Sequence, residues 1–183
     1  MGYEILEEDC FYHIYNRGNN KEDLFKREEN YYYFLKLMQK HLVPHFNVFA
    51  YVLMPNHFHL ILQVACESSI APQKLSNFFN AYSKAINKAF FRTGSLFQKP
   101  FQRKKINDEN YLRNTIIYVH LNPQNHGFVD NFEKYKFSSF QIYKNEEQTF
   151  LCKGQTIELF DDLENFICCH RTFNNENFKD DFN

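Results

Sequence analysis

Apolar and aromatic positions along the chain predict four β-strands. Residues 11–16 are aromatic and β-branched, and the following Arg17-Gly18-Asn19-Asn20 has the residues of a turn. Two apolar runs joined by Met54-Pro55-Asn56 predict a hairpin. The predicted strands cover residues 11–16, 46–53, 57–64 and 101–106. The last is expected at a sheet edge, because its consecutive Arg103, Lys104 and Lys105 would discourage pairing with another chain.

Three other segments carry apolar residues at helical spacing. Pro72 suits the first turn of one helix, and Asp108 suits the N-cap of another, which Pro123 is expected to end. The predicted helices cover residues 28–42, 72–91 and 109–121.

The order strand, helix, strand, strand, helix, strand, helix predicts an α+β ferredoxin-like sandwich with an extra helix. Two helices would cover one face of an antiparallel sheet and leave the other face free for a site. We assign residues 1–144 to this domain and residues 145–183 to an acidic, partly ordered C-terminal extension. The extension has possible short elements at 150–151 and 159–167, and its polar, Asn-rich end is expected to be poorly ordered.

Length and composition suit a single domain whose core is packed largely with Phe and Tyr. No apolar run is long enough to cross a membrane, and the N-terminal residues do not resemble a signal peptide, so we expect a cytoplasmic protein without membrane contact. The five cysteines form no C-x-x-C pair, which argues against a disulfide framework and against a cysteine zinc site.

Charge is distributed unevenly along a chain whose net charge is only −1. Residues 1–144 carry 18 Lys and Arg against 13 Asp and Glu, whereas residues 145–183 carry 3 against 9. Residues 74–113 hold nine basic and two acidic side chains. Such a segment is either a phosphate-binding surface or simply a solvated basic face.

The segment His57-Phe58-His59 places two imidazoles at alternate positions of a predicted strand. Side chains alternate between the two faces of a strand, so both histidines project from the same face. They can therefore converge on one metal ion, although two histidines on a strand can also be ordinary polar residues of a solvated face.

The helix predicted over 109–121 carries the candidate nucleophile. Tyr118 and Asn122 are four residues apart, so a phenol and an amide oxygen can point to the same place. If this helix lies over the histidine face, Asn122 supplies a third ligand and Tyr118 attacks a phosphodiester. Asn122 can instead cap the helix end before Pro123. Two nitrogens and one oxygen suit Mg²⁺ or Mn²⁺, and a nearby cation would activate a phenol whose ordinary pKa is about 10.

Four sequence blocks between residues 11 and 143 resemble the single-tyrosine HUH transposases, specifically the REP-associated tyrosine transposases. The blocks are Tyr12-His13-Ile14-Tyr15-Asn16-Arg17-Gly18-Asn19, Tyr51-Val52-Leu53-Met54-Pro55-Asn56-His57-Phe58-His59-Leu60, Tyr118-Val119-His120-Leu121-Asn122-Pro123 and Lys136-Phe137-Ser138-Ser139-Phe140. The resemblance implies a metal-dependent endonuclease and strand transferase that acts on single-stranded DNA, often beside a hairpin, through a 5′-phosphotyrosine intermediate. It also implies that His57 and His59 bind the metal and that Tyr118 is the nucleophile. Asn122 occupies the position at which related transposases carry a third polar ligand, so it either fills that role or caps the helix end.

Single-stranded or hairpin DNA is therefore the expected partner, and a homodimer is possible. The candidate phosphate contacts are Lys99, Arg103, Lys104 and Lys105. Asn16 and Arg17 end the first strand, where they either contact DNA or shape the turn. Phe97 and Phe101 are either stacking partners for bases or core residues. The acidic extension is unusual for a DNA-processing enzyme and could cover or regulate the basic surface.

Two other functions remain open at this stage. The first is a domesticated DNA-hairpin-binding protein of the same fold without transposition activity. The second is a metal-dependent hydrolase in which metal-bound water attacks and Tyr118 only packs.

Overall fold

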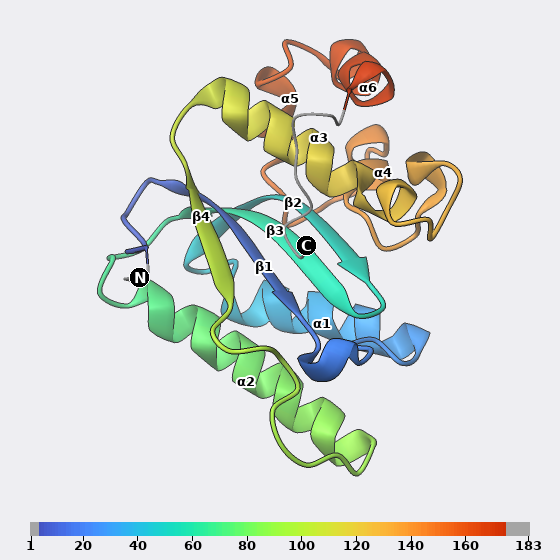
Figure 1. Ribbon diagram of the computed structural model, residues 1–183. Coiled ribbons are helices and arrows are strands. Elements are labelled where there is room, and N and C mark those ends of the chain that lie inside the picture. The colour runs from blue at the N-terminus through green and yellow to red at the C-terminus, as the bar shows by residue number, and fades with distance from the viewer. Residues whose placement is uncertain (1–3, 175–183) are drawn as a thin grey trace.

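The computed structural model describes residues 4–174 and consists of a four-stranded antiparallel sheet with helices on both faces (Figure 1). The strands are β1 (Phe11–Arg17), β2 (Phe46–Met54), β3 (His57–Val64) and β4 (Gln102–Ile106). Their spatial order is β2-β3-β1-β4, with every neighbouring pair antiparallel. This is the predicted ferredoxin-like arrangement, with the histidine strand β3 in the interior of the sheet and β4 at its edge.

The helices are α1 (Glu28–His41), α2 (Ala71–Ala89), α3 (Glu109–Asn125), α4 (Phe140–Lys144), α5 (Lys153–Glu158) and α6 (Leu163–Thr172), with short 3-10 turns η1 (Asn19–Lys21) and η2 (Phe132–Lys134). No helix among the described residues is long and apolar enough to span a membrane.

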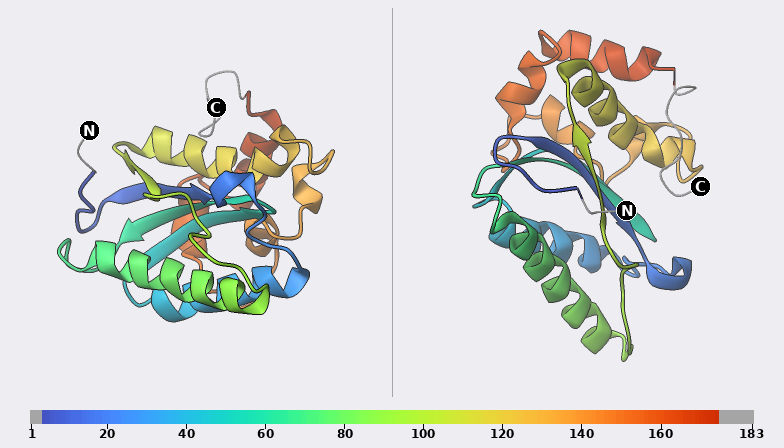
Figure 2. Two further views of the ribbon diagram at one scale, coloured as in Figure 1. Left: turned by 60° about the horizontal axis from the view of Figure 1, so that its bottom comes forward. Right: turned by 60° about the vertical axis from the view of Figure 1, so that its left-hand side comes forward.

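Helices α1 and α2 cover one face of the sheet, as the sequence predicts (Figure 2). Buried aromatic residues fill the space between these helices and β3. The ring of Phe34 on α1 lies 5.2 Å from that of Phe58 on β3 and 4.8 Å from that of Phe78 on α2. All three side chains are fully buried. The Phe34–Phe78 contact is edge-to-face, an arrangement that favours aromatic packing beyond the area that is buried.

The opposite face of the sheet, which was expected to be free, is covered by a helix. Helix α3 runs across it and packs mainly against β2, so the sheet is enclosed between α3 and the α1–α2 pair (Figure 2). The predicted site face is therefore the interface between the sheet and α3.

The end of α3 corrects one prediction, because the helix continues through Pro123 to Asn125 instead of ending at Leu121. Proline removes one backbone donor, which costs most in the middle of a helix. Here the turn after Pro123 is closed by backbone bonds from His126 to the Asn122 carbonyl (2.9 Å) and from Phe128 to the Pro123 carbonyl (2.8 Å). One missing bond is tolerated this close to the C-terminus.

The described part of the acidic extension belongs to the same hydrophobic core as the sheet. Leu151 forms a parallel bridge with Val48 of β2, and Phe160 and Phe166 are almost completely buried. The short element expected at 150–151 corresponds to this bridge, and the one expected at 159–167 overlaps only the first half of α6. The end of the chain beyond residue 174, where poor order was expected, lies outside the described residues.

Candidate active site

His57 and His59 lie on the face of β3 that α3 covers. Alternation along the strand sends Phe58 to the opposite, α1–α2 face, where its ring meets Phe34. The two imidazole rings are 5.4 Å apart between centroids and nearly perpendicular. Only 2% of His57 and none of His59 is exposed. Both imidazoles are therefore buried side by side between the sheet and α3.

Each imidazole of the pair is oriented by a hydrogen bond to its Nδ1 atom. His57 Nδ1 lies 2.6 Å from the side-chain oxygen of Asn56, and His59 Nδ1 lies 2.9 Å from His13 Nε2. The Asn56 oxygen can only accept, so His57 carries its proton on Nδ1 and has its lone pair on Nε2. If His59 also donates through Nδ1, both Nε2 atoms can coordinate a metal. A second contact that fixes the tautomer is typical of metal-binding histidines.

Burial keeps these imidazoles neutral at ordinary pH. It lowers the pKa of His57 to about 3, with smaller contributions from His126 and the Arg17 guanidinium. It likewise holds the pKa of His59 well below its usual value, and the neighbouring histidines act in the same direction. Neutral imidazole is the form that binds metal.

Tyr118 lies on the same side of the sheet as the histidines. It projects from α3, and its ring centroid is 6.0 Å from that of His59 and 6.2 Å from that of His13, both nearly edge-on. Its side chain is 5% exposed. The helix N-terminus is fixed by Asp108, whose carboxylate accepts a hydrogen bond from the Tyr111 amide (2.7 Å), as its expected N-cap role requires. The structure thus brings together Tyr118 and the two histidines, which are distant in sequence.

Asn122 is buried one turn after Tyr118 on α3. Its side-chain nitrogen donates to the Tyr118 carbonyl (2.9 Å), a bond back to the preceding turn. Because α3 continues for three more residues, the interpretation of Asn122 as a cap at the helix end is wrong. The amide oxygen is on the other side of the planar group from this bond, and its role as a third ligand stays a prediction.

Two further histidines join the pair, and sequence reasoning missed both. His13 on β1 stacks on His59 at 5.0 Å, and His126 at the end of α3 lies 5.0 Å from His57. Burial and the Lys104 ammonium lower the pKa of His13 to about 3. Alternation along the first strand predicts that His13 lies on the same face as Arg17, because the two are an even number of residues apart. The contact between His13 and His59 also depends on the register of the two strands, which one sequence does not give. His126 is brought to the site only because α3 extends past Pro123.

The six predicted DNA contacts divide between the two faces of the sheet. Arg17 pairs with His57 across β1 and β3, and Lys104 pairs with His13 across β1 and β4. Directly opposed residues of neighbouring strands share a face, so Arg17 and Lys104 lie on the histidine face. The Lys104 ammonium also lies 5.2 Å from the Tyr111 ring centroid on α3.

The other four predicted contacts lie elsewhere. Arg103 and Lys105 alternate with Lys104 and are therefore on the α1–α2 face, where Lys105 forms an ion pair with Glu7 (2.8 Å). Lys99 is exposed in the segment before β4. Asn16 is 97% buried and uses its amide locally, accepting from the Arg17 backbone (2.8 Å) and donating to the Gln98 carbonyl (3.2 Å). These bonds favour the turn-shaping role that was considered for Asn16.

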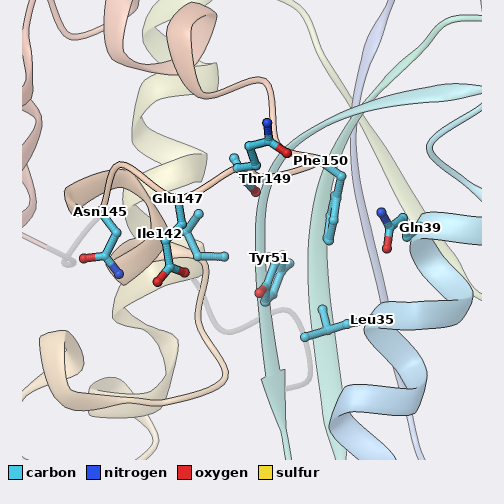
Figure 3. Close-up of a pocket in the computed structure, with 9 residues that line it drawn as sticks. Leu35, Gln39, Tyr51, Ile142, Asn145, Glu147, Thr149 and Phe150 are labelled. Carbon is cyan, nitrogen blue, oxygen red and sulfur yellow. The ribbon is translucent and has the colours of Figure 1, made fainter.

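A pocket of about 490 Å³ lies at the β2 edge between α1 and the segment before α5 (Figure 3). Its walls include Tyr51, Phe150 and the Glu147 carboxylate, and it contains none of the predicted site residues. A carboxylate in the wall makes this pocket unsuited to DNA phosphates.

Comparisons with known proteins bear on this geometry. No family model matches the chain. A putative REP-associated tyrosine transposase of Haemophilus influenzae is 23% identical over 104 residues, which are 52% of this chain and 59% of that relative, so the chain matches little more than half of the relative's length. The solved structure of a REP-associated tyrosine transposase bound to a REP hairpin has the same fold, with a TM-score of 0.62 and 17% identity, covering 79% of this chain and 84% of that one. The predicted fold class and the resemblance to REP-associated tyrosine transposases are both confirmed.

Proposed function

We propose that the chain is a metal-dependent, single-stranded DNA endonuclease and strand transferase that acts on hairpin-containing DNA through a 5′-phosphotyrosine intermediate. The observation that carries this proposal is the position of Tyr118, whose ring lies 6.0 Å from His59 on the histidine face of the sheet. The hairpin DNA in the structurally similar transposase complex supports the choice of substrate.

The residues proposed to hold a divalent ion are His57 and His59 through Nε2, with Asn122 as the third ligand. The hydrogen bonds on both Nδ1 atoms and the depressed pKa values suit this role. Nitrogen ligands combined with an amide oxygen fit Mg²⁺ or Mn²⁺ with positions left for phosphate oxygens. A bound ion would stabilise negative charge on the scissile phosphate and hold it in line with the nucleophile.

Tyr118 would attack the phosphorus through its phenolic oxygen. A new bond from that oxygen to phosphorus forms while the bond to the 3′ oxygen breaks, which leaves a free 3′-hydroxyl and a 5′-phosphotyrosine. Attack of a 3′-hydroxyl on this linkage reverses the step and joins strands. Arg17 and Lys104, which share the face, are proposed to hold flanking phosphates.

The proposed reaction uses a single chain. Tyr118 and the histidine pair meet within one molecule, on one face of the sheet, so the nucleophile needs no exchange between protomers. A homodimer would then assemble two independent sites.

One observation favours the alternative, a hairpin-binding protein without transposition activity. Among residues 4–174 no group of three or more His, Cys, Asp or Glu is arranged to hold a metal ion. The proposed site therefore depends on an amide to complete the ligand set, which is weaker than a carboxylate.

Covalent trapping tests the proposal against this alternative. An end-labelled DNA hairpin with a single-stranded flank is incubated with Mn²⁺ and resolved on a denaturing gel. The wild-type protein is expected to form a slow-migrating adduct, Tyr118→Phe to form none, and the matched variant Tyr111→Phe on the same helix to behave as wild type. Hairpin binding without an adduct would establish the alternative, and cleavage that persists in Tyr118→Phe would establish attack by water.

A further inference from the structure

The pocket of about 490 Å³ at the β2 edge contains none of the residues assigned to DNA cleavage, and its walls carry a chemistry of their own (Figure 3). Leu35 and Gln39 come from α1, Tyr51 comes from β2, and the other lining residues come from α4 and from the segment 145–150 that follows it. The volume falls in the range of sites that hold one small organic molecule. We call this cavity the β2-edge pocket.

The segment that closes the β2-edge pocket is anchored to the fold at both ends. The Asn145 amide donates to the Ile142 carbonyl of α4 (3.3 Å), and the Cys152 amide donates to the Val48 carbonyl of β2 (2.9 Å). Between these bonds, the Phe150 side chain packs against the hydrophobic core. The pocket is therefore a fixed feature of the folded chain and does not need a ligand in order to form.

Tyr51 presents a buried polar group to the β2-edge pocket. Its side chain is only 4% exposed, and within residues 4–174 no group forms a hydrogen bond with its hydroxyl. The hydroxyl points toward the part of the wall formed by Ile142 and Glu147 (Figure 3). Burial raises the pKa of Tyr51, so the phenol stays neutral and its oxygen can accept a hydrogen bond. A buried hydroxyl of this kind marks a place where a bound molecule can supply the missing partner.

The β2-edge pocket carries negative charge. Among its lining residues, all of which the structure describes, Glu147 alone is charged, and its carboxylate forms no ion pair with another described residue. The lysines that flank the segment are engaged elsewhere, because Lys144 pairs with Glu133 (3.2 Å) and Lys153 donates to the Asn145 backbone carbonyl. The carboxylate is therefore available to a cation inside the pocket.

Aromatic faces add a preference for a flat cation. The Tyr51 and Phe150 rings are nearly parallel, with an interplanar angle of 18° and centroids 6.4 Å apart. Ring faces attract cations, and a planar group can lie against them with full contact. Guanidinium and amidinium groups are planar and carry several N–H donors in one plane, which match the two oxygens of a carboxylate. Exposed amides of Gln39 and Gln148 complete the rim.

We propose that the β2-edge pocket binds a small organic cation that carries an amidinium or guanidinium group. The group pairs with the Glu147 carboxylate and donates to the Tyr51 hydroxyl oxygen, while its flat face lies against the Phe150 ring. This inference goes beyond the proposed function, because it assigns a second ligand at a separate place on the molecule.

The test titrates the full chain with benzamidine and with benzamide, a neutral molecule of nearly the same shape. Backbone amide shifts in nuclear magnetic resonance spectra locate the site and give both affinities. Benzamidine is expected to shift the amides of residues 145–150 and of Tyr51 in a saturable manner. Benzamide should bind about tenfold more weakly, because it lacks the charge that pairs with the carboxylate.

Three variants assign the contacts. Glu147→Gln should weaken benzamidine binding about tenfold and leave benzamide binding nearly unchanged. Tyr51→Phe, which removes only the hydroxyl, should weaken benzamidine binding about two- to tenfold. The matched control is Glu146→Gln, an exposed carboxylate next in sequence that does not line the pocket, and it should behave as wild type.

The outcomes decide the proposal without reference to DNA cleavage. Equal benzamidine affinities of the wild type and Glu147→Gln, shifts confined to residues outside the pocket, or absence of saturable binding would overturn it. Tighter binding of a capped tripeptide with a central arginine than of agmatine, a free guanidinium compound, would overturn the assignment to a small molecule. Loss of strand cleavage in a separate assay would leave this pocket unaffected.

Discussion

The rings of Tyr118 and His59 lie 6.0 Å apart, nearly edge-on, although the two residues come from α3 and β3 on different layers of the fold. This relationship exists because α3 crosses the face of the sheet to which strand alternation sends both His57 and His59. It joins a candidate nucleophile to a candidate metal pair within one chain.

Metal binding should depend on His57 and His59 and on the hydrogen bond between His57 Nδ1 and the Asn56 side chain. His57→Gln is expected to weaken Mn²⁺ binding strongly. Asn56→Ala, which removes the acceptor for His57 Nδ1, should weaken it about 10–100-fold. Asn56→Asp retains the acceptor and should restore binding. Titration followed by electron paramagnetic resonance measures the affinities, with His41→Gln on α1 as the control. Unchanged affinity in His57→Gln would remove the proposed site.

Cleavage should occur within one chain. We expect a mixture of Tyr118→Phe and His57→Gln proteins to form no covalent adduct, because neither molecule contains a complete site. The assay is the denaturing gel described above, with each variant alone and the wild type as references. Recovery of the adduct in the mixture would show that two chains share an active site.

Lys104 and Lys105 should differ in their contribution to DNA binding, although they are adjacent in sequence. Lys104 lies on the histidine face, whereas Lys105 lies on the other face and is paired with Glu7. Lys104→Gln should reduce the slope of log affinity against log salt by about 0.7–0.9, the value for one phosphate contact, and Lys105→Gln should leave it nearly unchanged. Fluorescence anisotropy with a hairpin at several salt concentrations measures both slopes. Equal slopes in the two variants would contradict the assigned faces.

Folding stability should decrease as the pH falls below about 6.5. Burial lowers the pKa of His170 to about 4, against weaker opposing effects of its hydrogen bond to the Phe166 carbonyl and of Glu133, and burial holds the pKa of His120 well below its usual value. The unfolded chain therefore binds protons that the folded protein does not bind, and the free energy of unfolding decreases with pH down to the folded-state pKa. Each such group contributes at most about 1.4 kcal/mol per pH unit.

Substitution of His170 isolates its share of this effect. His170→Gln removes the titrating group, so its free energy of unfolding should depend less on pH than that of the wild type between pH 7 and pH 4.5. Urea unfolding at several pH values gives the comparison, and His41→Gln serves as the control. If the free energy of unfolding of His170→Gln depends on pH as steeply as that of the wild type, this histidine does not bind a proton on unfolding.

His120 and His170 also show where sequence reasoning stopped short. Periodicity predicted the strands, the helices and the common face of His57 and His59, because these follow from local geometry. The pairing of His120 Nδ1 with His170 Nε2 at 2.8 Å, with Ser139 Oγ 2.7 Å from the other nitrogen, could not be predicted, because it joins three distant segments. The sequence alone therefore predicts a partly ordered acidic extension from residue 145, whereas in the structure α6 packs against the helix that carries Tyr118.

The faces of the three consecutive basic residues on β4 can be predicted from the sequence. Alternation along a strand implies that Lys104 faces away from Arg103 and Lys105, so the three side chains do not form one surface on a single face of the sheet. By contrast, the contacts of His13 and His126 with the histidine pair depend on strand register and on the end of α3. Neither follows from one sequence.

The most direct test of the central claim is to identify the residue that becomes linked to DNA. Wild-type protein is incubated with Mn²⁺ and a hairpin substrate, the adduct is digested with protease and nuclease, and the modified peptide is sequenced by mass spectrometry. The structure predicts a nucleotide phosphate on the oxygen of Tyr118, within the peptide that spans α3. A phosphate on another tyrosine, or strand cleavage without any modified peptide, would contradict the assignment of Tyr118 as the nucleophile.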